Sequence, residues 1–282
     1  MVPRLVMAGD RMPATDVAGC PDVETWRATG GAVIAYGAVV EGRHWIDMPG
    51  IARYRFGRRG GSVVAQPHPS VAAGLVEDAY RRAVLPLVLQ VRGTEVLHAS
   101  AVRSPRGVVA FCAESGIGKS TLAAALGRRG YPVWADDAIA VDTSSSPMMT
   151  ARLPFRIHLR PPSVALFREE LPAAEVAGSE SSEAGAAEQV PMAALCVLRR
   201  TDRLAGAVAI EKLSRPAALP ALLSHAYCFS LRNVDRKRRM LTHYASLATA
   251  VPVFEVRIES GLRLLPEILG QLEVWMSTGF AR

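Results

Sequence analysis

Cysteine is scarce in this sequence, and its few cysteines form no recognisable motif. Cys20, Cys112, Cys196 and Cys228 are scattered along 282 residues, and no two of them have the spacing of zinc ligands or of a redox pair. This absence excludes the usual kinds of zinc centre and disulfide framework. Cys112 and Cys196 lie in apolar runs and are expected in the core. A reducing cytoplasm is the simplest compartment for such a chain.

Long apolar runs are also missing. No uninterrupted run reaches the length of a membrane span. Charges and prolines interrupt the N-terminal stretch before the core of a signal peptide can form. No internal repeat is visible. We therefore expect no membrane span and no membrane partner.

Positive charge is present in modest excess. Lys and Arg number 33 against 26 Asp and Glu, which gives a net charge of +7. Such an excess suits phosphate-bearing ligands or an acidic partner, but a solvated basic surface is the favoured explanation, and no nucleic-acid partner is expected. Half of the residues are hydrophobic, enough for a substantial core in one large domain or two small ones.

The chain is expected to divide into a β-rich N-terminal region, residues 1–90, and an α/β domain, residues 91–282. Short strands such as "AVIAYGAVVEG" and "IARYRFG" alternate with Gly-rich turns in the first region. A helix, "SVAAGLVEDAYRRAVLPLVLQ", closes it, with Ser70 as N-cap and Pro86 bending its end. In the second region, "TEVLHASAV", "GVVAFC", a helix over 119–129 and "YPVWADD" follow the order of a P-loop α/β core.

Residues 169–190 interrupt that order. They are rich in Ala, Gly, Ser and Glu and contain no aromatic residue. This composition predicts a mobile acidic loop, either a plain disordered insertion or a lid that orders on substrate binding. Two strands ("AALCVLRR" and "AVAIEKLS"), a Pro-started helix, a basic helix, the strand "VPVFEVRI" and an amphipathic helix over 262–276 are expected after it.

The loop "AESGIGKS" has the Walker A pattern, with Ala113 where glycine is commoner. An apolar run precedes it and an Ala/Leu-rich helix follows, as the motif requires. Gly116 and Gly118 let the backbone curl so that its N–H groups point at phosphate oxygens. Lys119 can reach the β- and γ-phosphates, and the Ser120 hydroxyl can ligate Mg²⁺. The expected phosphate-binding residues are Ser115, Gly116, Ile117, Gly118, Lys119, Ser120 and Thr121.

Two adjacent aspartates, Asp136 and Asp137, follow the next expected strand. In open α/β sheets ligands bind at the carboxyl ends of strands. One carboxylate can hold Mg²⁺ or its water, while the other accepts a proton from an attacking hydroxyl. The alternative is a turn in which the aspartates only cap backbone groups. The P-loop upstream favours the catalytic interpretation.

The segments "LHASAV", "ESGIGKS" and "ADD" resemble the catalytic domain of HPr kinase/phosphorylase. They are even more similar to the smaller HPr-kinase-related proteins of bacterial gene clusters, including the tailoring kinases of lasso-type peptides. The resemblance covers residues 90–160 well and the C-terminal strand and helix more loosely. It implies a P-loop kinase core of the HPr-kinase C-terminal type that uses ATP and Mg²⁺ to phosphorylate a serine hydroxyl on a peptide or protein. Because the bifunctional relatives form hexamers, a homo-oligomer is a further implication.

The same resemblance suggests roles for individual residues. Lys119 and Ser120 would bind phosphate and metal, Asp137 would be the general base, and Asp136 would be its helper and a metal ligand. His98 matches an active-site histidine of the family. A core histidine that is hydrogen-bonded to a backbone carbonyl is the alternative for His98.

The sequence also departs from the bifunctional enzymes. Thr121 stands where they usually carry glutamate, and their downstream signature, a glutamate before an Arg-Gly-rich run, has no clear equivalent. The nearest stretch, "LPFRIHLRPPS", offers Arg156, His158 and Arg160, which alternation along a strand would place on one face. They could clamp a phosphate or an acidic substrate, or form an exposed basic face. A phosphorylase reaction and HPr itself are therefore not implied.

Two other functions remain open. One is a nucleotide-binding scaffold without turnover, in which Asp136 and Asp137 only bind Mg²⁺. The other is a P-loop small-molecule kinase, although such a kinase is expected to have an Arg-rich lid and the long insertion here is acidic. ABC-type ATPases and GTPases fit poorly, because the sequence has neither an "LSGGQ" signature nor an "NKxD" guanine reader. Transfer of phosphate to a peptide separates a kinase from a scaffold.

Overall fold

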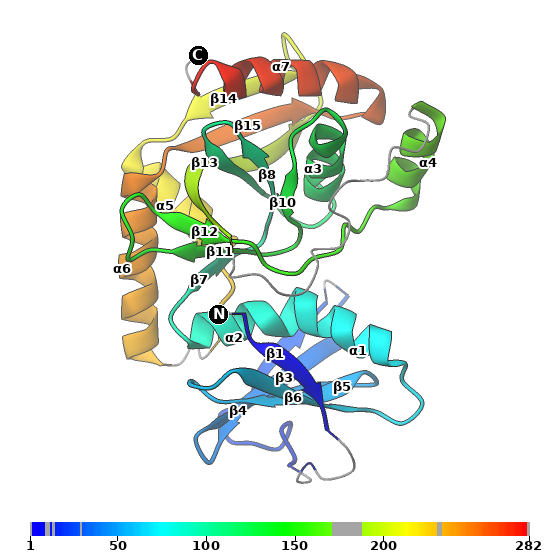
Figure 1. Ribbon diagram of the computed structural model, residues 1–282, viewed down its shortest axis with the longest axis vertical. Coiled ribbons are helices and arrows are strands. Elements are labelled where there is room, and N and C mark those ends of the chain that lie inside the picture. The colour runs from blue at the N-terminus through cyan, green and yellow to red at the C-terminus, as the bar shows by residue number, and fades with distance from the viewer. Residues whose placement is uncertain are drawn as a thin grey trace. The chain divides into compact units, whose positions relative to one another are not determined.

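The computed structural model describes residues 2–8, 12, 15–28, 30–170, 188–229 and 233–280, with the backbone alone for residues 168–170. The chain forms two compact units: unit 1 comprises Met1–Thr94 and Cys228–Arg236, and unit 2 comprises Glu95–Tyr227 and Lys237–Arg282. Helices and two sheets combine in a mixed α/β architecture, as the sequence predicts (Figure 1). In the described part of the chain no helix has both the length and the apolar composition of a membrane span.

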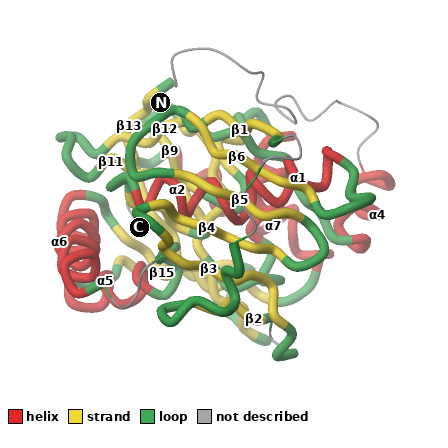
Figure 2. Tube along the Cα trace, turned by 90° about the horizontal axis from the view of Figure 1, so that it is seen from below, coloured by secondary structure: helices red, strands yellow, loops and turns green. Residues whose placement is uncertain are grey.

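Unit 1 is built on a six-stranded sheet of order β1-β6-β5-β4-β3-β2, which Figure 2 shows from below. Strands β2 to β6 are antiparallel neighbours, and β1 pairs in parallel with β6. Alternate residues of β5 are buried, and the hydroxyl of Tyr54 on that strand donates to the carbonyl of Val76 at 2.8 Å. The strands are β1 (Arg4–Met7), β2 (Glu24–Arg27), β3 (Val33–Val40), β4 (Arg43–Met48), β5 (Ala52–Phe56) and β6 (Ser62–Pro67).

The helix that follows this sheet begins and bends differently from the sequence-based expectation. Its first part, α1 (Ala73–Ala79), has no side-chain N-cap. Ser70, the predicted cap, lies in the preceding turn with a φ of +66°. A π-helical turn, η1 (Tyr80–Val84), then leads into α2 (Leu85–Val91). Pro86 lies in the first turn of α2 and has no N–H to donate, which accounts for a distortion upstream of it rather than at the helix end.

Unit 2 contains a nine-stranded sheet of order β10-β8-β9-β13-β12-β11-β7, with β15 paired to β13 and β14 paired to β15. Its strands are β7 (Glu95–Leu97), β8 (Ala99–Ser104), β9 (Gly107–Cys112), β10 (Val133–Ala135), β11 (Ile139–Asp142), β12 (Met149–Ala151), β13 (Gln189–Thr201), β14 (Val208–Lys212) and β15 (Val253–Glu259). Its helices are α3 (Lys119–Arg128), α4 (Pro161–Glu170), α5 (Arg215–Leu223), α6 (Val234–Ala250) and α7 (Leu265–Ser277), with a 3-10 turn η2 (Leu262–Leu264) before α7. Residues 234–236 of α6 are grouped with unit 1.

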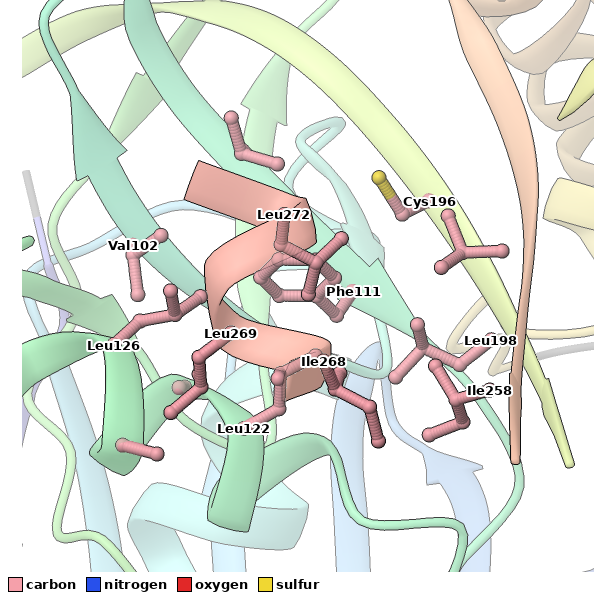
Figure 3. Close-up of a cluster of buried hydrophobic side chains, with 14 of the residues drawn as sticks. Val102, Phe111, Leu122, Leu126, Cys196, Leu198, Ile258, Ile268, Leu269 and Leu272 are labelled. Carbon is pink, nitrogen blue, oxygen red and sulfur yellow. The ribbon is translucent and has the colours of Figure 1, made fainter. Parts of the chain in front are cut away.

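Two hydrophobic cores cover the two faces of this sheet. Along β9, Val109 and Phe111 face the core that contains α3 and α7 (Figure 3). Val108, Ala110 and Cys112 belong to the other core, with residues of α5 and α6. This period of two is what a strand buried on both faces produces. Cys112 and Cys196 are both fully buried, as predicted.

Two predicted segments have different boundaries in the structure. The expected strand "TEVLHASAV" is interrupted at His98, because β7 pairs with β11 whereas β8 pairs with β9 and β10. Most of the predicted acidic loop, 169–190, lies outside the described residues. Its first residues end α4 and its last residues begin β13, where buried Val190 pairs with Thr150. At both ends, therefore, the predicted segment overlaps regular secondary structure.

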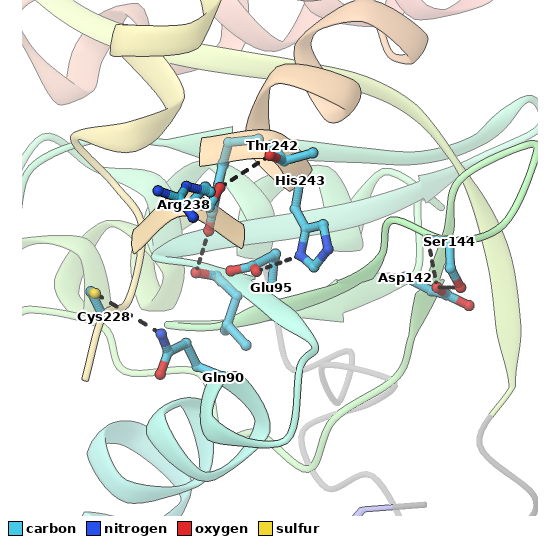
Figure 4. A network of polar contacts seen from close by, with 10 residues as sticks. Gln90, Glu95, Asp142, Ser144, Cys228, Arg238, Thr242 and His243 are labelled. Carbon is cyan, nitrogen blue, oxygen red and sulfur yellow. Dashed lines mark hydrogen bonds and ion pairs between the residues drawn. The ribbon is translucent and has the colours of Figure 1, made fainter. Parts of the chain in front are cut away.

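Helix α6 is joined to the sheet of unit 2 by a buried polar contact. The Glu95 carboxylate on β7 lies 2.8 Å from Nδ1 of His243 on α6 (Figure 4). The Tyr244 hydroxyl donates to the carbonyl of Val96 at 2.9 Å. Both contacts attach the helix to a short edge strand, which has few ladder bonds of its own.

Candidate active site

Strand directions bring the candidate residues to one edge of the unit 2 sheet. Strands β9, β13 and β15 are parallel, whereas β8 is antiparallel to both of its neighbours, β9 and β10. The carboxyl ends of β10 and β9 therefore meet the amino end of β8 at one edge. The carboxyl ends of β13 and β15 continue the same edge on the far side of β9. Ligands of open α/β sheets bind at such an edge.

The predicted phosphate-binding loop connects β9 to α3 at this edge. Gly116 and Gly118 have φ values of +94° and +113°, a region that favours glycine. A Cβ added at Gly116 would lie 3.1 Å from Nη2 of Arg160, and one at Gly118 would lie 3.3 Å from Nη2 of Arg200. Arg200 also donates from Nε to the carbonyl of Ile117 at 2.9 Å. Two guanidinium groups therefore lie against the loop, where they can bind an anion.

Lys119, the first residue of α3, is buried and is held by the loop itself. Its Nζ donates to the carbonyls of Ala113 at 2.8 Å and Glu114 at 3.4 Å. Burial lowers the pKa of the Lys119 ammonium, and the charge of Asp137 opposes that shift. The ammonium thus lies close to the aspartate pair and to the loop that would hold phosphate.

Asp136 is the most firmly held of the candidate side chains. Its Oδ1 accepts hydrogen bonds from Ser100 at 2.6 Å and Ser120 at 2.8 Å, and its Oδ2 accepts one from the backbone N–H of His158 at 3.1 Å. The side chain is only 5% exposed. Burial raises the pKa of Asp136, as does the neighbouring charge of Asp137, while the hydrogen bonds act in the opposite direction. This carboxylate is fixed in direction and linked to the serine of the P-loop.

Asp137 differs from its neighbour in exposure and in backbone conformation. It is partly exposed, and its φ is +64°, a left-handed conformation that is uncommon outside glycine. Its carbonyl accepts a hydrogen bond from the Tyr227 hydroxyl at 3.2 Å. The two aspartates are therefore adjacent in sequence but distinct in environment, which is the condition for separate chemical roles.

The donor atoms around the aspartates fit a divalent cation. Asp136, Asp137 and His158 each offer one ligand atom within 4.8 Å of the others. The two carboxylates and the Ser120 hydroxyl are the oxygen donors that Mg²⁺ prefers. His158 supplies a nitrogen, which is less suited to Mg²⁺ than to transition metals. The oxygen donors alone are a set that can hold Mg²⁺. The assignment of Ser120 and Asp136 as metal ligands stays a prediction.

Arg156, His158 and Arg160 are placed near the site, although not by the predicted strand. Residues 152–160 form no strand, and the backbone N–H of His158 donates to the Asp136 carboxylate. Exposure nevertheless alternates, so that the three basic side chains are exposed while Ile157 and Leu159 pack against the core. The guanidinium of Arg160 lies against Gly116 of the loop.

The remaining predicted residues lie close to the P-loop or to β7. Ser115 is exposed in the loop, and the Thr121 hydroxyl is 2.9 Å from the hydroxyl of Ser163, at the start of α4. His98 is partly exposed, its N–H donates to the carbonyl of His225 at 2.7 Å, and its ring centroid is 6.1 Å from that of Tyr227. The residue roles assigned from the resemblance stay predictions.

Several residues of the site were not singled out in the sequence. Ser100 lies within "LHASAV", and its role depends on the antiparallel pairing of β8. His225 precedes an isolated bridge between Leu97 and Ala226. Burial lowers the pKa of His225, as do the charges of Lys119 and Arg199, while Glu114 raises it, so this histidine lies in the electrostatic field of the loop. No local pattern marks residues 225–227, because long-range pairing places them there.

The comparisons with known proteins give a match among solved structures alone. No family model matches the chain, and no curated protein does. Among solved structures the chain is similar to the Hpr(Ser) kinase/phosphatase from Coxiella burnetii, with 15% sequence identity and a TM-score of 0.34. The match covers 66% of this chain and 93% of the other. Because the sequence identity and the TM-score are both low, the function proposed below rests on the residues of the site.

Proposed function

We propose that the protein is an ATP- and Mg²⁺-dependent kinase that transfers the γ-phosphate to a serine hydroxyl of a peptide or protein. One observation carries the proposal: the Asp136 carboxylate accepts a hydrogen bond from Ser120, the residue that follows the P-loop lysine. The metal-ligating and phosphate-binding groups are thereby joined in one network. Asp137 is partly exposed beside that network, where an incoming hydroxyl can reach it.

The residues divide the reaction between them. The N–H groups of the loop around Gly116 and Gly118, together with the Lys119 ammonium, hold the phosphates. Asp136 and Ser120 would hold Mg²⁺, which neutralises charge on the β- and γ-phosphate oxygens when it is bound. Asp137 accepts the proton of the serine hydroxyl as the new O–P bond forms and the bond to the ADP oxygen breaks.

The proposed acceptor class rests on the sequence resemblance. The resemblance to HPr-kinase-related proteins favours a serine on a peptide or protein, and a peptide encoded in the same gene cluster, of the lasso type, is the finer proposal. Arg156 and Arg160 are exposed near the site and supply positive charge for an acidic acceptor or for the transferred phosphate. Homo-oligomer formation stays a prediction.

The test compares two aspartate variants that keep the side-chain size. Asp137→Asn removes the base but leaves the P-loop intact, so Mg²⁺–ATP should bind with similar affinity while phosphate transfer falls by about 10²-fold or more. Asp136→Asn should instead make ATP affinity depend more steeply on Mg²⁺ concentration. The measurement incubates labelled ATP with peptides encoded beside the gene and locates the label by mass spectrometry.

Two outcomes contradict the proposal. If the wild-type protein binds ATP but labels no peptide or protein and shows no turnover, the scaffold interpretation replaces it. If both variants transfer phosphate at the wild-type rate, the aspartate mechanism is wrong. An exchange of the two phenotypes means that the base and the metal ligand are assigned in the wrong order.

A further inference from the structure

His158 is held beside the aspartate pair by its neighbours in the sequence and by its own backbone. Ile157 and Leu159 pack against the core of unit 2, while the side chain of His158 between them is exposed. The backbone N–H of His158 donates to Oδ2 of Asp136 at 3.1 Å. Two packed neighbours and this hydrogen bond therefore fix the residue next to the aspartates, although it belongs to no strand or helix.

A second hydrogen bond sets the tautomer of the His158 ring. Its Nδ1 lies 3.0 Å from the carbonyl oxygen of Arg156. A carbonyl oxygen can only accept a hydrogen bond, so Nδ1 carries the proton, and the lone pair of the neutral ring is on Nε2. Histidines that bind metal ions commonly have this arrangement, in which one ring N–H donates to a carbonyl or carboxylate and the other nitrogen is the ligand. The ring is thus prepared to offer Nε2 to a cation.

The carboxylates beside this ring have room for a cation as well. Three donor atoms, one each from Asp136, Asp137 and His158, lie within 4.8 Å of one another, and this is the only such group of three in the part of the chain that the structure describes. The Asp136 carboxylate has about four lone-pair positions. Three hydrogen bonds occupy it, those from Ser100, Ser120 and the backbone of His158, so one position is left for a cation. Asp137 has two carboxylate oxygens, so one can face the cation while the other accepts a proton.

A mixture of oxygen and nitrogen donors discriminates between cations. Mg²⁺ prefers oxygen ligands and gives up its waters reluctantly, so an imidazole adds little to its binding. First-row transition-metal cations accept imidazole nitrogen readily, and Mn²⁺ among them also takes carboxylate oxygens. We propose that His158 is a metal ligand through Nε2 and makes this cluster prefer a divalent transition-metal cation to Mg²⁺. The role of His158 rests on the proposed function, in which Asp136 holds the cation that accompanies ATP.

The test titrates Mn²⁺ into the nucleotide-free protein and follows the free ion by electron paramagnetic resonance, with Mg²⁺ as competitor. Mn²⁺ binds most weakly of the first-row series, so a preference for it over Mg²⁺ is the most demanding case. His158→Gln replaces the ring nitrogen by an amide oxygen and keeps the backbone N–H that bonds to Asp136. Its Mn²⁺ affinity should fall about tenfold or more, since losing only a hydrogen-bond partner of a metal ligand already costs about 10- to 100-fold. Its Mg²⁺ affinity should change little.

Pulsed electron paramagnetic resonance identifies the ligand directly. A ring nitrogen bound to Mn²⁺ modulates the electron spin echo, and this signal should be present in the wild type and absent in His158→Gln. His68→Gln is the matched control. Nε2 of His68 also lies near an aspartate, 3.6 Å from Oδ1 of Asp47 in unit 1, but no group of three donors forms there among the described residues. This variant should keep the nitrogen signal and the wild-type Mn²⁺ affinity.

The nitrogen signal separates a metal ligand from a neighbouring side chain. If the wild type shows no such signal, or if His158→Gln keeps it, His158 is not the ligand and the proposal is overturned. A wild-type protein that binds Mg²⁺ as tightly as Mn²⁺ overturns the preference. The samples contain neither ATP nor acceptor, so these failures leave the kinase proposal standing. Conversely, a protein that binds Mn²⁺ through His158 but transfers no phosphate contradicts the kinase proposal alone.

Discussion

Asp137 is held in its left-handed conformation by a hydrogen bond from outside its own segment. The Tyr227 hydroxyl reaches the Asp137 carbonyl at 3.2 Å, and it comes from a stretch that pairs with β7 through Ala226. A residue at φ +64° keeps that conformation only when its surroundings impose it. We therefore regard Tyr227 as a positioning residue for the candidate base.

Tyr227→Phe is expected to lower the rate constant of phosphate transfer about fivefold to tenfold, with an unchanged KM for ATP. The change removes one hydrogen bond, worth roughly 1 kcal/mol, and keeps the ring beside His98. Steady-state kinetics at saturating acceptor measure the effect. Tyr54→Phe is the control, because its buried hydroxyl also donates to a carbonyl, that of Val76, within unit 1. It should lower the melting temperature and leave the rate constant of the folded protein unchanged, and equal kinetic effects in both variants would contradict the positioning role.

Alanine substitutions at two glycines with positive φ test whether the loop needs glycine at position 118. Gly118→Ala places a methyl group 3.3 Å from Arg200 at a φ of +113°, and we expect it to weaken ATP binding at least tenfold, because the loop must change shape. Gly130→Ala introduces a similar backbone strain at φ +92° in open space. Both variants should lose stability, but only the first should lose nucleotide affinity in calorimetry. Equal ATP affinities would show that the loop does not need glycine there.

Among the elements, α6 depends on a buried carboxylate of β7. Glu95 is 1% exposed and its partner His243 is 32% exposed. Glu95→Ala leaves the imidazole without its acceptor and should lower the free energy of unfolding by about 1–3 kcal/mol. Glu211→Ala removes an exposed ion pair with Arg257 and should cost less than about 1 kcal/mol. Urea denaturation of both variants measures the difference. Equal values would mean that the buried contact adds no more than a surface ion pair.

Elements with strong local signals could be predicted from the sequence. β9 is a continuous apolar run, α3 is rich in Ala and Leu, and the Walker pattern marks the loop between them. The break at His98 could not be predicted, because it depends on the different partners of β7 and β8. For the same reason, Ser100 and Tyr227 were missed: pairing between distant segments brings them to the aspartates, and no local pattern records it.

At the scale of the whole molecule, unit 1 contains a histidine that should make it sensitive to acid. His44 is 7% exposed, and its ring stacks on Phe56 with 5.3 Å between centroids. Its Nδ1 has no hydrogen-bond partner among the described residues. Burial lowers the pKa of His44 from 6.5 to about 4, and the charge of Arg58 acts in the same direction.

The direction of the pH effect on the unfolding free energy follows from the protonation of His44 in the folded and unfolded states. Between pH 6.5 and about 4, the unfolded chain takes up a proton at His44 that the folded protein excludes. The free energy of unfolding therefore rises with pH across this window, and the contribution is lost as the pH falls through it. We expect a loss on the order of 1–3 kcal/mol.

Denaturation followed by tryptophan fluorescence at pH 7 and pH 4.5 measures this loss. His44→Phe keeps an aromatic ring against Phe56 and cannot titrate, so the difference in unfolding free energy between the two pH values should be smaller in the variant. Because carboxylates also titrate near the lower pH, the comparison with the wild type isolates the histidine. An identical pH dependence in both proteins would exclude His44 as the cause.

The path of the chain through the two units has a consequence for how the protein is made. Residues 228–236 belong to unit 1, although unit 2 occupies the sequence before and after them. Phe229 in that stretch stacks on Trp26, with 5.6 Å between the ring centroids, and lies against His44. During translation, residues 1–94 leave the ribosomal exit tunnel long before Phe229 is synthesised. Unit 1 therefore cannot complete its packing until most of unit 2 has been synthesised, and a gene divided after residue 94 would encode an N-terminal fragment that lacks part of its own core.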